Sequence, residues 1–138
     1  MKVYVDQSGK IENTSKPTVL AFTNKESFTL KVSPRVKRQL QEVFRRKGLA
    51  RLFVYRIFAS LVFLLIRGHL KRIDQVIIDT EYPGKEILIR DIILEQVRKL
   101  GSREPTIDFK RIGNKPKVHY AAYNVFIRKR KATKTVSF

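Results

Sequence analysis

Three short stretches with the alternating pattern of β-strands fill the first 32 residues, ahead of any helical pattern. They span residues 2–6, 18–23 and 27–32 and are rich in β-branched and aromatic side chains. Turn residues, among them Ser8-Gly9, separate them. This spacing predicts an antiparallel meander of three strands. Helical and strand patterns follow it, so we predict an α/β fold.

Strand and helix patterns alternate through the rest of the chain. Ser33 and Pro34 predict a helix start, with serine as the cap and proline in the first turn. Gly48 is expected to end or bend this helix. The remaining expected elements are a helix over 49–68, a strand over 75–80, a helix over 85–100, a strand over 106–110, a helix over 117–131 and a frayed tail from about 132. A length of 138 residues suits one domain with the order β-β-β-α-β-α-β-α.

An apolar run extends from Leu52 to Ile66, and its uncharged part lies between Arg56 and Arg67. A bilayer-spanning helix needs about 20 apolar residues, and shorter runs are more typical of buried helices. We therefore predict a core helix and no integral membrane insertion. Its all-round hydrophobicity would also suit a homodimer interface through the helix at 52–66. Because no apolar leader opens the sequence, a cytoplasmic location is expected.

The net charge of +18 favours nucleic acid as a partner, ahead of an anionic membrane surface. A basic surface with no such partner is the alternative. The charge is uneven: residues 34–72 carry 11 basic and 1 acidic side chains, residues 73–109 carry 5 and 8, and residues 110–138 carry 9 and none. Carboxylates inside a positively charged groove are typical of metal-assisted phosphodiester chemistry.

Two predicted strands end in acids. Asp6 ends the first, and Asp79 lies near the end of the strand at 75–80, with Glu81 two residues further on the same face. A carboxylate on an apolar strand is costly unless something pairs with it, and oxygen-only ligands favour Mg²⁺ or Mn²⁺. The alternatives are a turn in which the Asp6 side chain bonds backbone amides near Ser8-Gly9, and a capping role for Asp79 before the next helix. Glu81 lies nearer the loop than Asp79.

The element order and two segments, Val3-Tyr4-Val5-Asp6-Gln7-Ser8-Gly9 and Val76-Ile77-Ile78-Asp79-Thr80-Glu81, resemble the ribonuclease H-like superfamily. The resemblance implies a mixed sheet with the first and fourth strands side by side. It also implies that their acids hold one or two Mg²⁺ or Mn²⁺ ions, which activate water against a phosphodiester. Asp6, Asp79 and Glu81 would then be the catalytic metal ligands.

This chain departs from the family in its helices. The family usually adds an acid from the last helix and often another from the first. Here the last helix has none, and His119 or Asn124 could take its place, His119 as ligand or proton shuttle and Asn124 as ligand. For both residues, ordinary surface packing is the commoner alternative. Glu42, the one acid of the first helix, lies opposite its apolar stripe and is expected to face solvent.

Basic side chains gather on the first helix and around the last. We predict nucleic-acid contacts for Arg35, Lys37, Arg38, Arg45, Arg46, Lys47, Lys115, Lys117, Arg128, Lys129 and Arg130. Lys and Arg neutralise phosphates without reading sequence, so binding should weaken as salt rises. Solvated helix faces are the alternative. The expected function is a metal-dependent nuclease of DNA or RNA, and the alternative is a non-catalytic nucleic-acid-binding protein on the same scaffold.

Overall fold

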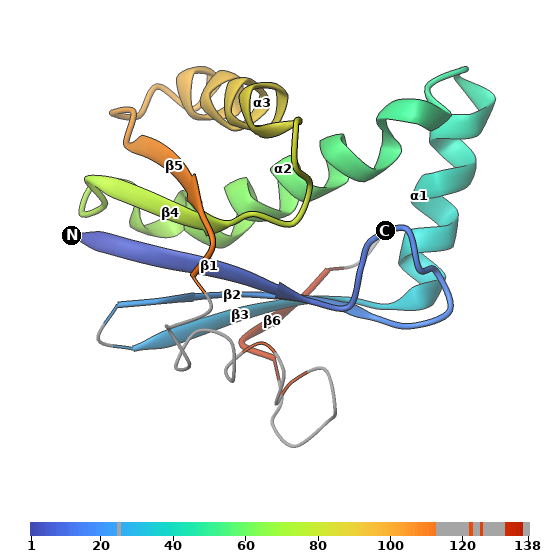
Figure 1. Cartoon of the computed structure of the whole chain (residues 1–138), viewed down its shortest axis with the longest axis horizontal. Coiled ribbons are helices and arrows are strands. Elements are labelled where there is room, and N and C mark those ends of the chain that lie inside the picture. The colour runs from blue at the N-terminus through green and yellow to red at the C-terminus, as the bar shows by residue number, and fades with distance from the viewer. Residues whose placement is uncertain (25, 113–121, 123–124, 126–131, 137–138) are drawn as a thin grey trace.

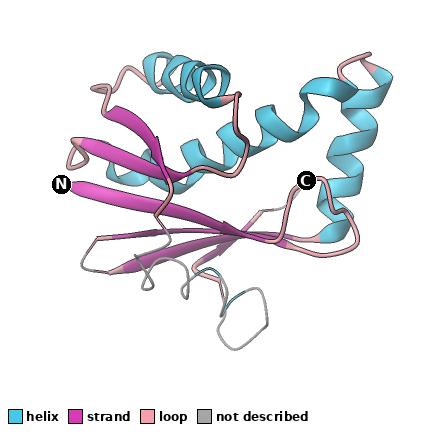
Figure 2. Cartoon of the chain, viewed as in Figure 1, coloured by secondary structure: helices cyan, strands magenta, loops and turns pink. Residues whose placement is uncertain are grey.

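A six-stranded mixed sheet forms the centre of the computed structural model, which covers residues 1–138 and describes all except 25, 113–121, 123–124, 126–131 and 137–138 (Figures 1 and 2). Within the described part, the strands are β1 (Lys2–Ser8), β2 (Thr18–Thr23), β3 (Ser27–Val32), β4 (Gln75–Asp79), β5 (Thr106–Lys110) and β6 (Lys134–Thr135). Their order across the sheet is β5-β4-β1-β2-β3-β6. The α/β class predicted from the sequence is confirmed.

The first three strands form the predicted antiparallel meander. β2 pairs with both β1 and β3 in antiparallel register, whereas β4 runs parallel to β1 and β5 runs parallel to β4. β1 is two residues longer than predicted, because Gln7 and Ser8 continue the pairing with Leu20 and Val19 of β2. Asp6 therefore lies inside a strand rather than at its end.

The helices begin and end close to their predicted positions. They are α1 (Pro34–Arg46), α2 (Phe53–Ile66) and α3 (Glu86–Lys99), with short 3₁₀ turns η1 (Ala50–Leu52) and η2 (Arg67–His69) on either side of α2. Ser33 Oγ accepts a hydrogen bond from Val36 N at 3.2 Å, which is the predicted cap of α1. Gly48 follows this helix at φ 71°, a left-handed conformation that favours glycine.

The apolar run forms α2, which is a core helix as predicted. Its buried side includes Phe58, Val62 and Ile66, and α2 and α3 together cover one face of the sheet (Figure 1). Within the described residues, no helix combines the length and apolarity that crossing a bilayer requires. The outer side of α2 lines a groove of about 690 Å³ with residues of α1 and α3. The homodimer through residues 52–66 stays a prediction.

The opposite face of the sheet carries a smaller apolar cluster. It contains Val19, Ala21, Ile77, Ile112, Ala122 and Val125. Ala122 and Val125 are helical and buried, and the other residues of the helix predicted over 117–131 lie outside the described part. Instead of the frayed tail expected from about residue 132, β6 pairs in parallel with β3. The candidate acids lie on this second face, as the register of β1 and β4 explains.

Candidate metal centre

Asp6 and Asp79 lie at the same level on neighbouring parallel strands. The register pairs Tyr4 with Ile77 and Val5 with Ile78, so the next step along both strands brings Asp6 beside Asp79. Side chains two residues apart share a face of a strand. Ile77 belongs to the smaller apolar cluster and Tyr4 packs against it, so Asp6 and Asp79 project from that same face of the sheet. The strand pairing alone brings these two carboxylates together.

Glu81 completes a cluster of three carboxylates. It follows the end of β4 by two residues, and one oxygen from each of Asp6, Asp79 and Glu81 lies within 4.8 Å of the others. Asp6 is buried, whereas Asp79 and Glu81 are half-buried. Like charges this close and this poorly solvated disfavour full ionisation. The structure thus unites the three acids that the sequence singled out.

Glu81 responds to this crowding by holding its proton. Burial, the charges of Asp6 and Asp79, and a side-chain hydrogen bond with Asp79 raise the pKa of Glu81 from 4.5 to about 8, and the charge of Lys10 offsets part of the rise. A proton shared in this way lowers the negative charge of the cluster. A divalent cation would do the same and would displace that proton.

Backbone amides orient two of the three carboxylates. Gln7 N donates to Asp6 Oδ1 at 2.8 Å, and Ile112 N donates to Asp79 Oδ1 at 2.9 Å. Asp6 accepts the amide of the next residue of β1. Asp79 accepts an amide from the segment after β5, and this contact differs from the helix-side cap considered for the sequence. These amides orient the Asp6 side chain within β1 and the Asp79 side chain at the end of β4.

The donor set fits a hard divalent cation. All three residues offer carboxylate oxygens, which Mg²⁺ and Mn²⁺ prefer over the nitrogen and sulfur ligands typical of zinc. One oxygen of each residue lies within 4.8 Å of the others, so all three could contact the same ion. Asp6, Asp79 and Glu81 are thus the residues of the described part that could hold the ion. His119 and Asn124, the further candidates, lie outside the described residues.

Glu42 is not a ligand of this cluster. Glu42 Oε1 pairs with Arg46 Nε at 3.1 Å, and Glu42 Oε2 pairs with Arg45 Nη1 at 3.3 Å. This acid faces solvent on α1, as its position opposite the apolar stripe predicted. Arg45 and Arg46 stay exposed, so these ion pairs leave them accessible to a phosphate.

Lys37 was wrongly assigned to nucleic-acid contact. Its side chain is fully buried, and its Nζ donates to Lys10 O at 3.1 Å, to Asn13 O at 2.6 Å and to Thr18 Oγ1 at 3.1 Å. Burial lowers the pKa of Lys37 from 10.5 to about 8, an effect that the charge of Glu12 partly offsets. Lys37 therefore fastens the loop between β1 and β2 and is not accessible to a phosphate backbone.

The other predicted nucleic-acid contacts divide into two groups. Arg35 and Lys47 are exposed on and just after α1, and Arg38, also exposed, donates from Nη1 to Thr14 O at 2.9 Å. Those outside the described residues are Lys115, Lys117, Arg128, Lys129 and Arg130. For the exposed group, nucleic-acid contact stays a prediction.

Two residues near the acids escaped the sequence interpretation. Lys10 follows the Ser8-Gly9 turn, and its charge acts on Glu81. Tyr82 follows Glu81, and its hydroxyl bonds both Gln7 and Glu12. Their proximity in sequence to Asp6 and Glu81 was the available signal. Proximity in sequence does not say which distant segments come together in the fold, so it could not predict the bonds of Tyr82 to Gln7 and Glu12.

Comparison with known proteins gives no relative from which a function could be inferred. Neither a family model, nor a curated protein, nor a solved structure matches this chain.

Proposed function

We propose that this chain is a metal-dependent nuclease that acts on phosphodiester bonds of DNA or RNA, on a ribonuclease H-like fold. The observation that carries the proposal is the cluster of Asp6, Asp79 and Glu81, whose oxygens lie within 4.8 Å of one another in a chain of net charge +18. The adjacency of β1 and β4 supports the fold part, because the resemblance implies that these strands lie side by side.

Each residue of the cluster has a distinct part in the proposal. Asp6 and Asp79, oriented by backbone amides, would hold the ion, and Glu81 would bind it after releasing its proton. When bound, Mg²⁺ or Mn²⁺ supplies positive charge that polarises a phosphodiester and lowers the pKa of a water molecule. Two lysines bring positive charge near the cluster: the charge of Lys10 acts on Glu81, and Lys110 of β5 pairs in register with Asp79. They would attract the phosphates of a bound nucleic acid.

The test is cleavage of labelled single- and double-stranded DNA and RNA in Mn²⁺. Asp6→Asn should abolish cleavage because it removes one charged ligand from the ion. Asp91→Asn, the same chemical change on the exposed side of α3, should leave cleavage unchanged. Undiminished cleavage by Asp6→Asn would refute the nuclease proposal.

A second candidate function is nucleic-acid binding without catalysis. It is favoured by the outward position of Glu42, which leaves the cluster without the acid that the family often adds from the first helix. Binding that weakens steeply with added salt, with no cleavage in Mg²⁺ or Mn²⁺, would support this candidate over the nuclease.

A further inference from the structure

The hydroxyl of Tyr82 lies at the junction of three segments that border the acidic cluster. Gln7 Nε2 donates to Tyr82 Oη at 3.2 Å, and Tyr82 Oη donates to Glu12 Oε1 at 3.3 Å. Gln7 is the neighbour of Asp6 on β1, and Glu12 belongs to the loop between β1 and β2. One hydroxyl therefore joins the strand that bears Asp6, this loop and the segment that bears Glu81.

The ring of Tyr82 is fixed by packing against α2. Its centroid lies 5.3 Å from that of Phe58 and 5.9 Å from that of Tyr55, both in edge-to-face geometry. The core thus sets the position of the hydroxyl relative to Gln7 and Glu12.

The loop that Tyr82 contacts is anchored at a second point. Lys37 Nζ binds the carbonyl oxygens of Lys10 and Asn13, which flank Glu12. The Glu12–Tyr82 bond then joins this anchored loop to the Glu81 segment. Without that bond, Glu81 would be tied less closely to the β1 side of the cluster.

Gln7 carries a cost that an apolar residue would avoid. It is 7% exposed and lies on the same face of β1 as Val3 and Val5, yet its Oε1 has no hydrogen-bond partner among the described residues. A buried acceptor without a partner is destabilising. Its Nε2 bond to Tyr82 is the contact that an aliphatic side chain could not make.

We propose that Tyr82 is a positioning residue of the candidate metal centre, whose hydroxyl holds Glu81 in reach of Asp6 and Asp79 through its bonds to Gln7 and Glu12. The inference rests on the proposed function, because the spacing of the three carboxylates matters when they share a cation. Residues that orient metal ligands typically contribute 10- to 100-fold to metal affinity.

The experiment measures Mn²⁺ affinity by titration calorimetry for wild type, for Asp79→Asn as the variant that lacks a ligand, for Tyr82→Phe, and for Tyr55→Phe as the control. The control removes a hydroxyl from the same ring cluster, at a residue whose hydroxyl makes no hydrogen bond to a described residue. Tyr82→Phe should weaken Mn²⁺ binding about 10- to 100-fold. It should also speed amide hydrogen exchange in residues 10–14 while melting close to Tyr55→Phe. Glu12→Ala, which breaks the same link from the exposed loop, should weaken Mn²⁺ binding in the same direction.

The outcomes separate this inference from the proposed function. If Tyr82→Phe binds Mn²⁺ as wild type does while Asp79→Asn loses binding, the positioning role is overturned and the metal centre stands. An equal loss in Tyr55→Phe would also overturn it, since the effect would then come from ring packing. If wild type binds no Mn²⁺, the metal centre itself is contradicted and the positioning role falls with it.

Discussion

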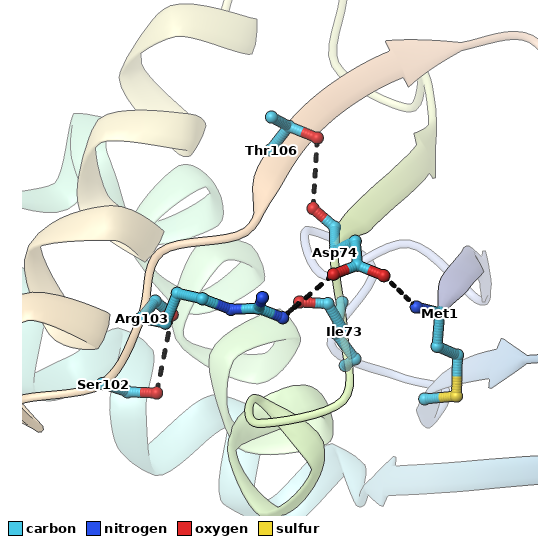
Figure 3. Close-up of polar contacts among 6 residues, drawn as sticks. All are labelled: Met1, Ile73, Asp74, Ser102, Arg103 and Thr106. Carbon is cyan, nitrogen blue, oxygen red and sulfur yellow. Dashed lines mark hydrogen bonds and ion pairs between the residues drawn. The ribbon is translucent and has the colours of Figure 1, made fainter.

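Acidic side chains lie at both ends of the parallel strands β1 and β4, but their charged neighbours differ between the two ends. At the amino end, Asp74 lies between the amino group of Met1 and Arg103 Nη2, the latter at 3.0 Å (Figure 3). At the carboxyl end, Asp6, Asp79 and Glu81 lie together. The chain supplies two cationic groups for one acid at the first end. At the second end it gathers three acids, and the charge of Lys10 offsets only part of their effect on Glu81.

The pKa shifts at the two ends have opposite signs for this reason. The hydrogen bond and charge of the Met1 amino group, aided by Arg103, lower the pKa of Asp74. Burial and the neighbouring acids raise the pKa of Glu81 to about 8. An acid with a lowered pKa already has its counter-charge, whereas one with a raised pKa takes up a proton or a cation. If the proposed metal centre exists, we therefore expect Mn²⁺ to act at the carboxyl end, where the three acids lie together.

The largest expected difference between the two ends is in stabilisation by Mn²⁺. At a free concentration 100-fold above its dissociation constant, a ligand that binds the folded state alone raises the free energy of unfolding by about 2.7 kcal/mol. Asp79→Asn should lose this gain because it removes a ligand, and Asp74→Asn should keep it. Thermal unfolding with and without Mn²⁺ measures both. Equal loss in the two variants would mean that the ends do not differ as argued.

A smaller difference is expected in the dependence of stability on pH without metal. The pKa of Glu81 is raised on folding from 4.5 to about 8, so its contribution to stability is present below pH 4.5 and is lost as the pH rises through 8. Asp74, with a lowered pKa, contributes in the opposite sense, because its contribution is lost as the pH falls. Glu81→Gln should remove the first trend and raise the free energy of unfolding near pH 8 by on the order of 1–2 kcal/mol, allowing for solvent screening.

Urea unfolding at about pH 5 and about pH 8 measures this trend. Glu26→Gln is the matched control, since Glu26 is exposed in the turn between β2 and β3, away from the cluster. If the free energy of unfolding changes with pH in the same way in Glu81→Gln and Glu26→Gln, the acids at the carboxyl end do not repel one another as their spacing indicates.

Local sequence patterns predicted most of the fold and placed two of the three clustered acids, Asp6 and Asp79, on strands. Ser33 and Pro34 determined the start of α1 because capping is a local interaction, and the alternation over 18–23 and 27–32 gave two strands with correct bounds. Asp6 and Asp79 could be paired in advance because both were predicted on strands expected to be adjacent. β6 was missed because two residues carry too little periodicity to mark a strand.

The burial and hydrogen-bond partners of single polar side chains were harder to predict. Lys37 resembles any basic helix residue in sequence, and its burial depends on the carbonyl oxygens of Lys10 and Asn13 folding over it. The same holds for Tyr82, whose hydroxyl bonds Gln7 of β1 and Glu12 of the loop that follows β1. Such contacts are set by tertiary geometry, which periodicity and composition do not encode.

The smallest expected effect is at the amino end, in the ion pair between Arg103 and Asp74. Both side chains are exposed, at 58% and 65%, and exposed ion pairs contribute little and are screened by salt. Arg103→Gln should lower the melting temperature slightly in dilute buffer, and the difference from wild type should shrink at about 1 M NaCl, where the screening length is only about 3 Å. Arg35→Gln, at an exposed position on α1, is the control for loss of one positive charge. If Arg103→Gln lowers the free energy of unfolding by more than Glu81→Gln raises it, the comparison is reversed. The ion pair at the amino end would then affect stability more than the repulsion among the acids at the carboxyl end.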